Sequence, residues 1–354
     1  MISANPTYRT AVLALPCVGT STVFGILDVL ASVGRDWEML HGDAPAPRVF
    51  DAALLSLDGK PYSDINGRRI TPDSAVTEFG TPDLIIVPDL HLDPNAPLPN
   101  ELSDFVPWIV DAHAKGAMIA SVCSGSLLLA ETGLLNGLDA TTHWGYCDTI
   151  ARRFPEIRLR RERILVPAGE GHRIVTAGGA SAWGDLILYL ISRLASEQEA
   201  RRVAKIYLLQ PHSDGQLHYA SLVAGRQHDD AVVAQAQVWA VDNYSNPTPV
   251  AAMAEQCGLT ERSLLRRFRK ATGQTPADYI QTLRIEEAKQ MLETSDMPIE
   301  DVASDVGYAE TSSFRNAFRK RVGMSASVYR RKWLTGSKNV HIGRADDGFV
   351  DRSR

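Results

Sequence analysis

The first two hundred residues alternate short apolar runs with longer stretches in which apolar residues recur every three or four positions. Four runs are apolar almost throughout and predict buried β-strands, at 11–18, 83–89, 117–123 and 173–179. Three stretches between and after them have the spacing of amphipathic helices, at 21–34, 101–116 and 181–196. Strands and helices that alternate in this way predict a doubly wound α/β fold with a mostly parallel sheet.

The last hundred residues change to helical periodicity and contain an internal repeat. Residues 249–279 align with 298–329 at an offset of 49 positions, which becomes 50 before a shared Phe-Arg-Lys. In each copy a short helix leads to a glycine, Gly258 or Gly307, which can adopt the positive φ of a sharp turn between helices. A second helix follows. Each copy therefore predicts a helix-turn-helix, and 277–295 predicts a long helix that links them.

A chain of 354 residues with 44% hydrophobic and 22% charged residues is expected to form two domains, each with its own core. We expect an α/β domain at 8–196 and an all-α domain with two helix-turn-helix motifs at 231–334. Residues 197–230 are expected to form a helical extension and a linker, because the end of this segment is polar and lacks periodicity. The polar, glycine-containing tail at 335–354 is expected to be disordered.

The formal net charge of −5 is unevenly distributed along the chain. Residues 1–230 carry 19 basic and 27 acidic side chains, whereas 231–334 carry 14 basic and 12 acidic ones. The basic residues of the second part cluster at 266–270, 318–321 and 329–333. Such clusters suit contacts with the phosphates of a nucleic acid, although solvated helix faces can have the same composition.

Several classes of protein are disfavoured by what the sequence lacks. No apolar run approaches the roughly 20 residues of a membrane-spanning helix, and the first residues lack the basic and apolar regions of a secretory signal. We therefore expect a cytoplasmic protein without a membrane partner. The four cysteines have no metal-ligand spacing and are expected to be free thiols in a reducing compartment. The sequence thus indicates neither a metal nor a cofactor.

Cys123 lies between an apolar run and a Ser-Gly-Ser step that opens an apolar helix. A turn from a strand into a helix exposes its residues at the carboxyl end of a parallel sheet, where such folds bind ligands. The nearby helix N-terminus is expected to lower the pKa of the thiol. His143 follows twenty positions later, and Asp28, Asp89 and His91 are further candidates to line the site.

The turn glycines, the segment LRIEEAKQML and the closing GMSASVYRRKW resemble the DNA-binding domain of AraC/XylS transcription regulators over about 100 residues. The resemblance implies that exposed residues of the second helix of each motif contact bases. These residues are Arg262, Leu265, Arg266, Thr311, Ser312, Ser313 and Asn316. Arginine can form two hydrogen bonds with guanine and asparagine with adenine, whereas leucine can contact only a thymine methyl. The neighbouring basic residues are expected at phosphates or in solvent: Arg267, Arg269, Lys270, Arg315, Arg319 and Lys320.

Residues 8–196 resemble the flavodoxin-like, class I glutamine amidotransferase-like domains of the PfpI type, through SVCSGSLLLAETGLLNG and LDATTHWGY. Cys123 and His143 match the nucleophile and partner histidine with which enzymes of that superfamily attack a carbonyl. Two departures oppose catalysis. Thr22 occupies the position of an acidic partner, and Asp89-Leu90 replaces a glycine pair whose amides stabilise an oxyanion. We therefore expect no catalytic residue, and four ligand-binding residues: Cys123, His143, Asp28 and Asp89.

An amidotransferase-like domain followed by a double helix-turn-helix resembles the GlxA-type branch of the AraC/XylS regulators. The resemblance implies a regulator that binds double-stranded promoter DNA, senses a small metabolite with its first domain and forms a homodimer through it. It further implies an activator that contacts RNA polymerase. Two alternatives stay open: a cysteine-dependent amidase or hydrolase joined to a DNA-binding domain, and a thiol redox-sensing regulator that acts through Cys123. A buried, inert thiol is a further interpretation.

Overall fold

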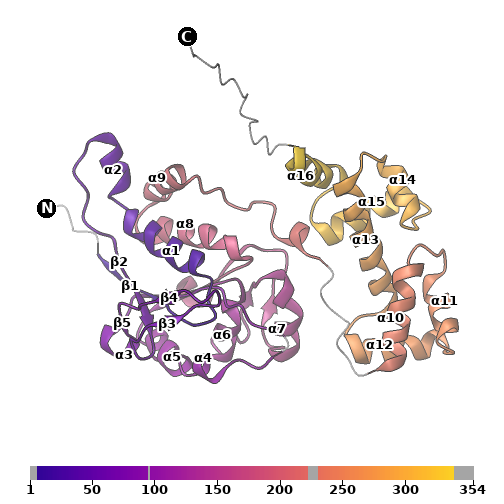
Figure 1. Cartoon of the computed structure of the whole chain (residues 1–354), viewed down its shortest axis with the longest axis horizontal. Coiled ribbons are helices and arrows are strands. Elements are labelled where there is room, and N and C mark those ends of the chain that lie inside the picture. The colour runs from indigo at the N-terminus through magenta and orange to yellow at the C-terminus, as the bar shows by residue number, and fades with distance from the viewer. Residues whose placement is uncertain (1–5, 95, 222–229, 339–354) are drawn as a thin grey trace, which may run out of the picture. The chain divides into compact units, whose positions relative to one another are not determined.

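The computed structural model of the chain describes residues 6–94, 96–221 and 230–338 (Figure 1). It has two compact units, the first running to Tyr219 and the second beginning at Ala220. The first unit is a sheet with helices and the second is helical. This confirms a doubly wound α/β domain followed by an all-α domain. The boundary falls inside the segment 197–230. Of the tail expected to be disordered at 335–354, residues 335–338 instead form the end of the last helix, and the rest, from residue 339 on, lies outside the described residues.

The first unit is built on a seven-stranded sheet in the order β10-β11-β7-β6-β1-β2-β5. Neighbouring strands are parallel except at one edge, where β10 is antiparallel to β11. The strands are β1 (Tyr8–Leu13), β2 (Phe50–Ser56), β5 (Ser74–Ala75), β6 (Leu84–Val87), β7 (Met118–Val122), β10 (Leu165–Ala168) and β11 (Ile174–Ala177). Two short pairs accompany the sheet: β3 (Tyr62–Ser63) with β4 (Arg69–Ile70), and β8 (Asp139–Ala140) with β9 (Arg158–Leu159). The strand order reverses between β1 and β6, the place where doubly wound folds bind ligands.

The central strands form because their residues are apolar toward both faces of the sheet, with the exception of Ser121 in β7 and Thr176 in β11. Every residue of β6, β7 and β11 is buried, as a parallel sheet with helices on both sides requires. Figure 1 shows α1 (Thr20–Ser32) and α8 (Trp183–Leu194) on one side, and α5 (Val106–Ala114) and α6 (Ser126–Glu131) on the other. The predicted strands and helices are therefore present, with shifted ends.

Two prolines explain where the structure differs from the predicted element bounds. β1 ends at Leu13, ahead of Pro16, because a residue without an N–H cannot continue a strand ladder. The helix predicted over 101–116 is divided into α4 (Asn100–Ser103) and α5, and Pro107 lies in the first turn of α5, where proline is tolerated. The sequence patterns also missed β2, β5 and β10.

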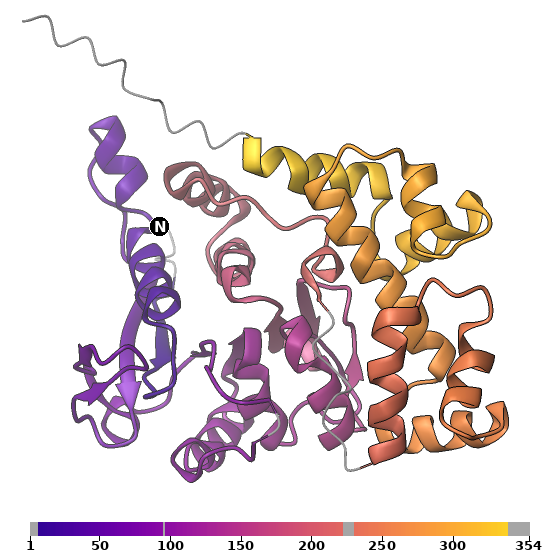
Figure 2. The ribbon, with the colours of Figure 1, turned by 45° about the vertical axis from the view of Figure 1, so that its right-hand side comes forward.

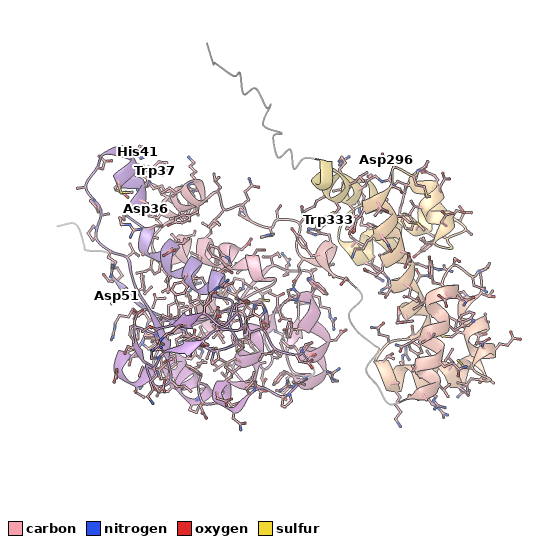
Figure 3. The ribbon with its side chains drawn as sticks, in the orientation of Figure 1. Asp36, Trp37, His41, Asp51, Asp296 and Trp333 are labelled. Carbon is pink, nitrogen blue, oxygen red and sulfur yellow. The ribbon has the colours of Figure 1, made fainter. Side chains whose placement is uncertain are left out.

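The segment after α8 stays with the first unit. α9 (Glu197–Tyr207) packs against α8 and α2 (Asp36–His41). The Arg202 guanidinium of α9 lies 5.6 Å from the ring centroid of Trp37 in α2, and Trp37 is labelled in Figure 3. Farther along, Gln216 and His218 are each 1% exposed. Residues 211–219 therefore belong to the packed domain, although their polar and aperiodic sequence indicates an exposed linker.

The second unit contains both predicted helix-turn-helix copies. α11 (Pro249–Gln256) turns at Gly258 into α12 (Glu261–Thr272), and α14 (Ile299–Asp305) turns at Gly307 into α15 (Thr311–Val322). The φ angles of the two glycines are 64° and 87°, a left-handed backbone that glycine adopts at little cost. The long α13 (Pro276–Thr294) joins the copies as predicted, while α10 (Ala231–Asn243) and α16 (Ala326–Lys338) complete the unit (Figure 2).

Each copy has its own hydrophobic core, and α13 contributes to both. Its residues Tyr279, Ile280 and Leu283 pack in the first core, with residues of α10, α11 and α12. Its residues Ile285, Ala288 and Leu292 pack in the second core, with residues of α14, α15 and α16. We refer to α10–α12 with the start of α13 as the first half, and to the end of α13 with α14–α16 as the second half.

Candidate functional site

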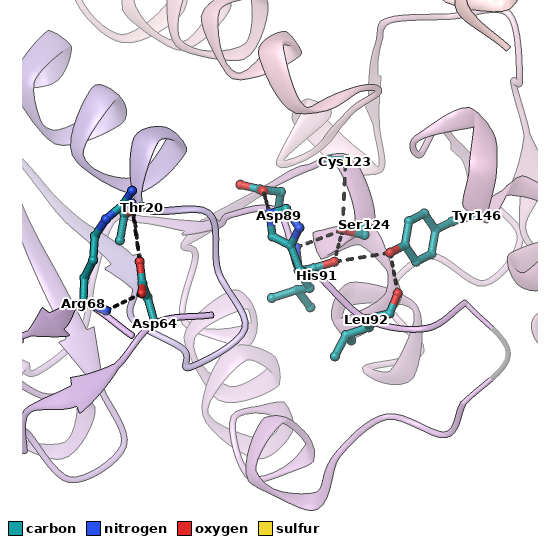
Figure 4. Close-up of polar contacts among 10 residues, drawn as sticks. Thr20, Asp64, Arg68, Asp89, His91, Leu92, Cys123, Ser124 and Tyr146 are labelled. Atoms are coloured by element: carbon teal, nitrogen blue, oxygen red, sulfur yellow. Dashed lines mark hydrogen bonds and ion pairs between the residues drawn. The ribbon is translucent and has the colours of Figure 1, made fainter. Parts of the chain in front are cut away.

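Cys123 lies in a tight turn at the carboxyl end of β7, as predicted. The turn is a short 3-10 segment, Cys123–Gly125, that leads directly into α6. Cys123 has a φ of 56°, a backbone conformation that is uncommon for a residue with a Cβ. The neighbouring Ser124 hydroxyl accepts a hydrogen bond from the Leu90 N–H (2.8 Å) and donates one to the Leu90 carbonyl (2.6 Å). These bonds fix the turn against the loop that follows β6 (Figure 4).

The thiol of Cys123 is held in its protonated form. The residue is only 6% exposed. Burial, reinforced by the negative charge of Asp89, raises the pKa of the Cys123 thiol to about 12 against opposing hydrogen bonds from Ser124. The prediction of a lowered pKa is therefore wrong, because burial and a nearby carboxylate outweigh any effect of the helix N-terminus. A protonated thiol is a poor nucleophile and a poor target for oxidation.

His143 lies close to the Cys123 turn without being paired to its thiol. The preceding Thr142 hydroxyl donates to the Cys123 carbonyl (3.0 Å), which joins the two segments. The His143 Nδ1 accepts from the Gly145 N–H (3.1 Å), and burial lowers the pKa of the ring, so it is neutral with its proton on Nε2. Among the hydrogen bonds of the described residues, none joins the ring to Cys123. The pair thus lacks the bond between base and nucleophile that a cysteine hydrolase uses.

Asp89 supplies a buried charge next to Cys123. The residue is 4% exposed, and its Oδ2 lies 3.1 Å from Nε2 of His91, an exposed ring. Its Oδ1 has no hydrogen-bond partner among the described residues. A Cβ at Gly19 would lie 2.6 Å from Oδ2, so a side chain there would displace the carboxylate from the beginning of α1. Burial, together with Asp89, also raises the pKa of Cys17 to about 11. The carboxylate therefore faces two neutral thiols.

A second polar cluster fixes the beginning of α1 (Figure 4). Asp64, in the turn between β3 and β4, accepts a hydrogen bond from the Thr20 hydroxyl (3.2 Å) and one from the Arg68 N–H (2.7 Å). The Arg68 guanidinium in turn donates to the Thr20 hydroxyl (2.8 Å). Because Thr20 is the first residue of α1, this cluster also holds Gly19 against Asp89.

The structure does not bring Asp28 to this site. Asp28 lies eight residues after Thr20 on α1, roughly 12 Å farther along the helix axis. It is exposed, and its carbonyl accepts a hydrogen bond from the Tyr207 hydroxyl of α9 (3.5 Å). Of the four expected ligand-binding residues, Cys123, His143 and Asp89 lie at the carboxyl end of the sheet and Asp28 does not.

Two residues that the sequence analysis missed also hold this end of the sheet together. The Tyr146 hydroxyl donates to the Leu92 carbonyl (2.6 Å), which ties the His143 segment to the loop after β6. The buried Gln216 ties residues 211–219 to the residues before His143. Its side-chain amide donates to Thr141 Oγ1 (3.1 Å), Thr142 O (2.8 Å) and Arg163 O (3.1 Å). A lone glutamine in a polar stretch gives no sequence signal of such a role.

α12 presents its expected DNA-binding residues on one exposed face. Leu264 and Phe268 are fully buried on the inner side. The exposed side carries Arg262, Leu265, Arg266, Arg269 and Lys270. These positions recur at helical spacing and so share a face. Arg267 is also exposed, but its Nε lies 2.6 Å from the carboxylate of Asp230, the N-cap residue of α10.

α15 presents the corresponding face of the second motif. Phe314 and Phe318 are buried on its inner side. The exposed residues are Ser312, Ser313, Arg315, Asn316, Arg319 and Lys320, while Thr311 at the start of the helix is half-buried. Arg315 forms an exposed ion pair with Glu300 of α14 (2.6 Å). Arg315 would therefore have to exchange this carboxylate for a phosphate in order to contact DNA.

The structure also bears on metals and membranes. The four cysteines all lie in the described part of the chain and carry free thiols. Within the described residues, no group of three or more His, Cys, Asp or Glu side chains is arranged to hold a metal ion. Of the helices formed by these residues, none has both the length and the apolar character needed to span a lipid bilayer.

Comparisons with known proteins agree with this architecture. Residues 45–192 match the model of the DJ-1/PfpI family, and residues 253–332 match that of a helix-turn-helix domain. The HTH-type transcriptional regulator CdhR of Pseudomonas aeruginosa is 28% identical over 278 residues, which cover 78% of this chain and 80% of the relative. GbdR of the same species is 25% identical over 276 residues (76% and 72%), and GlxA of Rhizobium meliloti is 28% identical over 221 residues (61% and 66%).

Proposed function

We propose that the chain is a regulator of the GlxA type, which controls transcription by binding double-stranded promoter DNA. A segment that matches the DJ-1/PfpI family followed by one that matches a helix-turn-helix domain supports this proposal. The observation that carries this proposal is the pair of exposed helical faces on α12 and α15, joined by α13. Each face combines side chains that can bond base edges with basic residues that suit phosphates. The relatives named as transcriptional regulators support the same conclusion.

The two faces are expected to contribute differently to sequence recognition. Arg262 and Arg266 can each bond a guanine, whereas Asn316 can bond an adenine, and Ser312 and Ser313 can bond several bases. Each good pair of hydrogen bonds to a base is worth about 1 to 3 kcal/mol of discrimination. Arg269, Lys270, Arg315, Arg319 and Lys320 lie beside these positions and would bind phosphates, which gives affinity without sequence preference.

Two arginines of α12 test this division because both are exposed on one helix and carry the same charge. Arg266→Ala should remove the preference for one base in the first half-site. Arg269→Ala should weaken binding to all duplexes about equally and reduce the slope of log affinity against log salt by about one. Fluorescence anisotropy over a salt series, with duplexes mutated at single positions, measures both effects. Identical behaviour of the two variants would refute the proposed orientation of α12.

We further propose that the first unit binds a small metabolite at the end of the sheet formed by Cys123, His143 and Asp89. Asp89 is nearly buried and has an oxygen without a partner among the described residues. A buried carboxylate is costly unless a cation or a hydrogen-bond donor meets it. The site therefore favours a metabolite with an ammonium or another N–H group over an anionic one. The neutral His143 ring can donate from Nε2 to the polar remainder of such a molecule.

A thermal-unfolding screen of the full chain tests this part of the proposal. The compounds are small primary, secondary and quaternary amines, each matched with a carboxylic acid of similar size. A ligand at 100 times its Kd should stabilise the unit that binds it by about 2.7 kcal/mol. Asp89→Asn should abolish the shift, and Asp28→Asn should leave it intact because Asp28 is exposed and lies away from the site. Carboxylic acids that stabilise the chain while amines do not would contradict the assignment.

The Cys123–His143 pair is not used for turnover. The relatives matched over most of the chain are named as regulators, and the pair lacks the acidic partner, the hydrogen bond and the thiolate that an amidase needs. The same raised pKa disfavours redox sensing through this thiol. The structure thus favours a binding role for Cys123 over both alternatives.

The chain is also expected to form dimers and to activate transcription. We propose that two chains associate through their first units in the cytoplasm, and that the DNA-bound dimer activates transcription by contacting RNA polymerase. Light scattering on the full chain should give twice the monomer mass of 38.7 kDa. A promoter fusion that responds to the stabilising amine in wild-type cells, but not in cells with the Asp89→Asn variant, would support activation through the first unit. A monomeric chain that activates fully would contradict the role of the dimer.

A further inference from the structure

The two halves of the second unit have separate cores, and Arg284 lies at the boundary between them on α13. Leu283 belongs to the first core and Ile285 to the second. Arg284, between them in the sequence, is only 7% exposed although it carries a charge. A buried charge is costly unless its donors are satisfied, so the contacts of this guanidinium must compensate for its burial.

The Arg284 guanidinium contacts both halves. Its Nε donates to the Tyr244 carbonyl (2.8 Å) and its Nη2 to the Asn246 carbonyl (2.9 Å), in the loop between α10 and α11 of the first half. Its Cζ lies 5.4 Å from the ring centroid of Tyr308, in the turn between α14 and α15 of the second half. The Tyr308 ring in turn packs edge-on against Phe314 of α15. One side chain thus connects the loop before the first motif with the turn inside the second.

Other contacts lie at the same boundary. Arg321 of α15 donates to the Thr282 hydroxyl in the first-half part of α13 (3.0 Å), and the Tyr308 hydroxyl donates to Gln281. The Tyr244 ring packs against both cores. Gly307 approaches the loop so closely that a Cβ there would lie 2.6 Å from the Ser245 carbonyl oxygen. Long helices curve, and α13 alone would leave the angle between the halves free to vary. The contacts at the boundary are therefore what makes the arrangement of α12 and α15 definite.

We propose that Arg284 is the positioning residue that fixes the orientation of α12 relative to α15, and thereby the spacing of the two DNA segments that the chain recognises. The inference rests on the proposed function, because it concerns how two helices meet one duplex. Arginine suits this position because its planar fork donates to two carbonyls while its face stacks on an aromatic ring. Arg284 acts through the loop and the turn that it joins.

Spacing is the property of DNA binding that such a residue controls. One base pair inserted between two recognised segments moves them apart by about 3.4 Å and rotates one relative to the other by about 35°. Two helices that are fixed relative to each other cannot follow this change, so the chain loses base contacts of one motif. Two helices that keep α13 and the other boundary contacts, but lose the link that Arg284 makes between the loop and the turn, can follow part of it.

The test uses the full chain and an operator that the wild-type chain selects from a random duplex library. Footprinting locates the two contacted segments, and the operator is then remade with one base pair inserted or deleted between them. We expect wild type to lose about tenfold or more in affinity for each altered spacing, the cost of one lost base contact. Arg284→Met keeps the length of the side chain without its donors, and should lose less than about threefold on the same change of spacing.

Arg330→Met is the matched control. Arg330 of α16 also donates to a backbone carbonyl, that of Met297, but both residues lie in the second half. This variant should keep the wild-type preference for one spacing. Tyr308→Leu is the second test variant, because it keeps the arginine and removes the ring under the guanidinium, together with the hydrogen bond from the Tyr308 hydroxyl to Gln281. It should relax the spacing preference part of the way.

Each outcome decides the inference. If Arg284→Met folds, as judged by circular dichroism, and prefers one spacing as strongly as wild type, Arg284 is not the positioning residue. If Arg284→Met does not fold, Tyr308→Leu decides, and an unchanged preference in that variant overturns the inference. If the wild-type chain selects no operator at all, the proposed function itself fails, which is a different result from a selected operator without dependence on Arg284.

Discussion

Alkylation of Cys123 by iodoacetamide should be about 100-fold slower than that of an ordinary thiol at pH 7. A pKa of about 12 leaves a thiolate fraction of roughly 10⁻⁵ at pH 7, against about 3% for a thiol of pKa 8.5. The more basic thiolate is intrinsically more reactive, which recovers a factor of about 40 for a Brønsted slope near 0.45. Dividing the loss in thiolate fraction by this gain in reactivity gives a reduction of about 100-fold in the rate. Limited access to the buried sulfur lowers the rate further. Since neutral pH lies below the pKa, the rate should rise about tenfold per pH unit from 7 to 9.

Mass spectrometry of tryptic peptides over a time course measures this rate for each cysteine separately. The same chain unfolded in urea, where the four thiols should react alike, provides the reference rate. Asp89→Asn should speed the alkylation of Cys123, because it removes a charge that raises the pKa of the thiol. The matched Asp28→Asn variant should not speed this alkylation, because Asp28 is exposed and lies on α1, away from Cys123. A native rate for Cys123 equal to the unfolded rate, or flat between pH 7 and 9, would refute the assignment of a protonated and inert thiol.

Three further predictions concern other parts of the chain. Gln216→Leu should destabilise the first unit by about 2 kcal/mol in urea unfolding, because it deletes the two N–H donors of a buried amide that meet three oxygens. Gln210→Leu, at an exposed position nearby, should have little effect. Equal effects would show that residues 211–219 are not anchored by Gln216. Gly258→Ala should cost the second unit about 1 kcal/mol of thermal stability, and Gly307→Ala should cost more. Both glycines have a positive φ, but only Gly307 has a carbonyl oxygen 2.6 Å from the added Cβ. A larger loss for Gly258→Ala would contradict the packing at Ser245. Glu300→Gln should raise DNA affinity at low salt by up to about fivefold, because it releases Arg315 from an exposed ion pair. The gain should vanish at high salt. A loss of affinity would mean that Arg315 does not bind a phosphate.

The parts of the fold that could be predicted from the sequence are those fixed by local patterns. Gly258 and Gly307 mark the two turns because a left-handed backbone favours glycine wherever it occurs. The strand before Cys123 is apolar except for Ser121, and the turn after it follows from the switch to helical spacing. In contrast, the edge strand β10 includes Pro167 and alternates buried with half-buried residues, and its short run resembles a loop.

The chemistry of the site could be predicted only in part, because it depends on contacts between distant segments. The pKa of the Cys123 thiol is set by burial and by Asp89, 34 positions earlier. Together they outweigh the lowering of the pKa that the nearby helix N-terminus suggests. Asp28 has the right chemistry, but helix α1 carries it away from Cys123. Gln216 is joined to Thr141 across 75 positions, and no periodicity reports such a contact.

The positioning role of Arg284 has a similar origin. In the sequence it is one charged residue in the middle of an amphipathic helix, where a solvated side chain is the usual expectation. Only the fold shows that the two helix-turn-helix cores meet at this position. A buried arginine between two cores can therefore be recognised only in a structure, because the sequence pattern does not distinguish it from a solvated arginine.

The central claim, that α12 and α15 together read the sequence of a duplex, is tested most directly by one competition measurement. The full chain is bound to its selected operator at moderate salt, and random duplex is added as the competitor. We expect at least a thousandfold preference for the operator, as is typical of specific DNA-binding proteins, and a marked drop in that preference for Arg266→Ala. Equal affinity for the operator and for random duplex would contradict the claim.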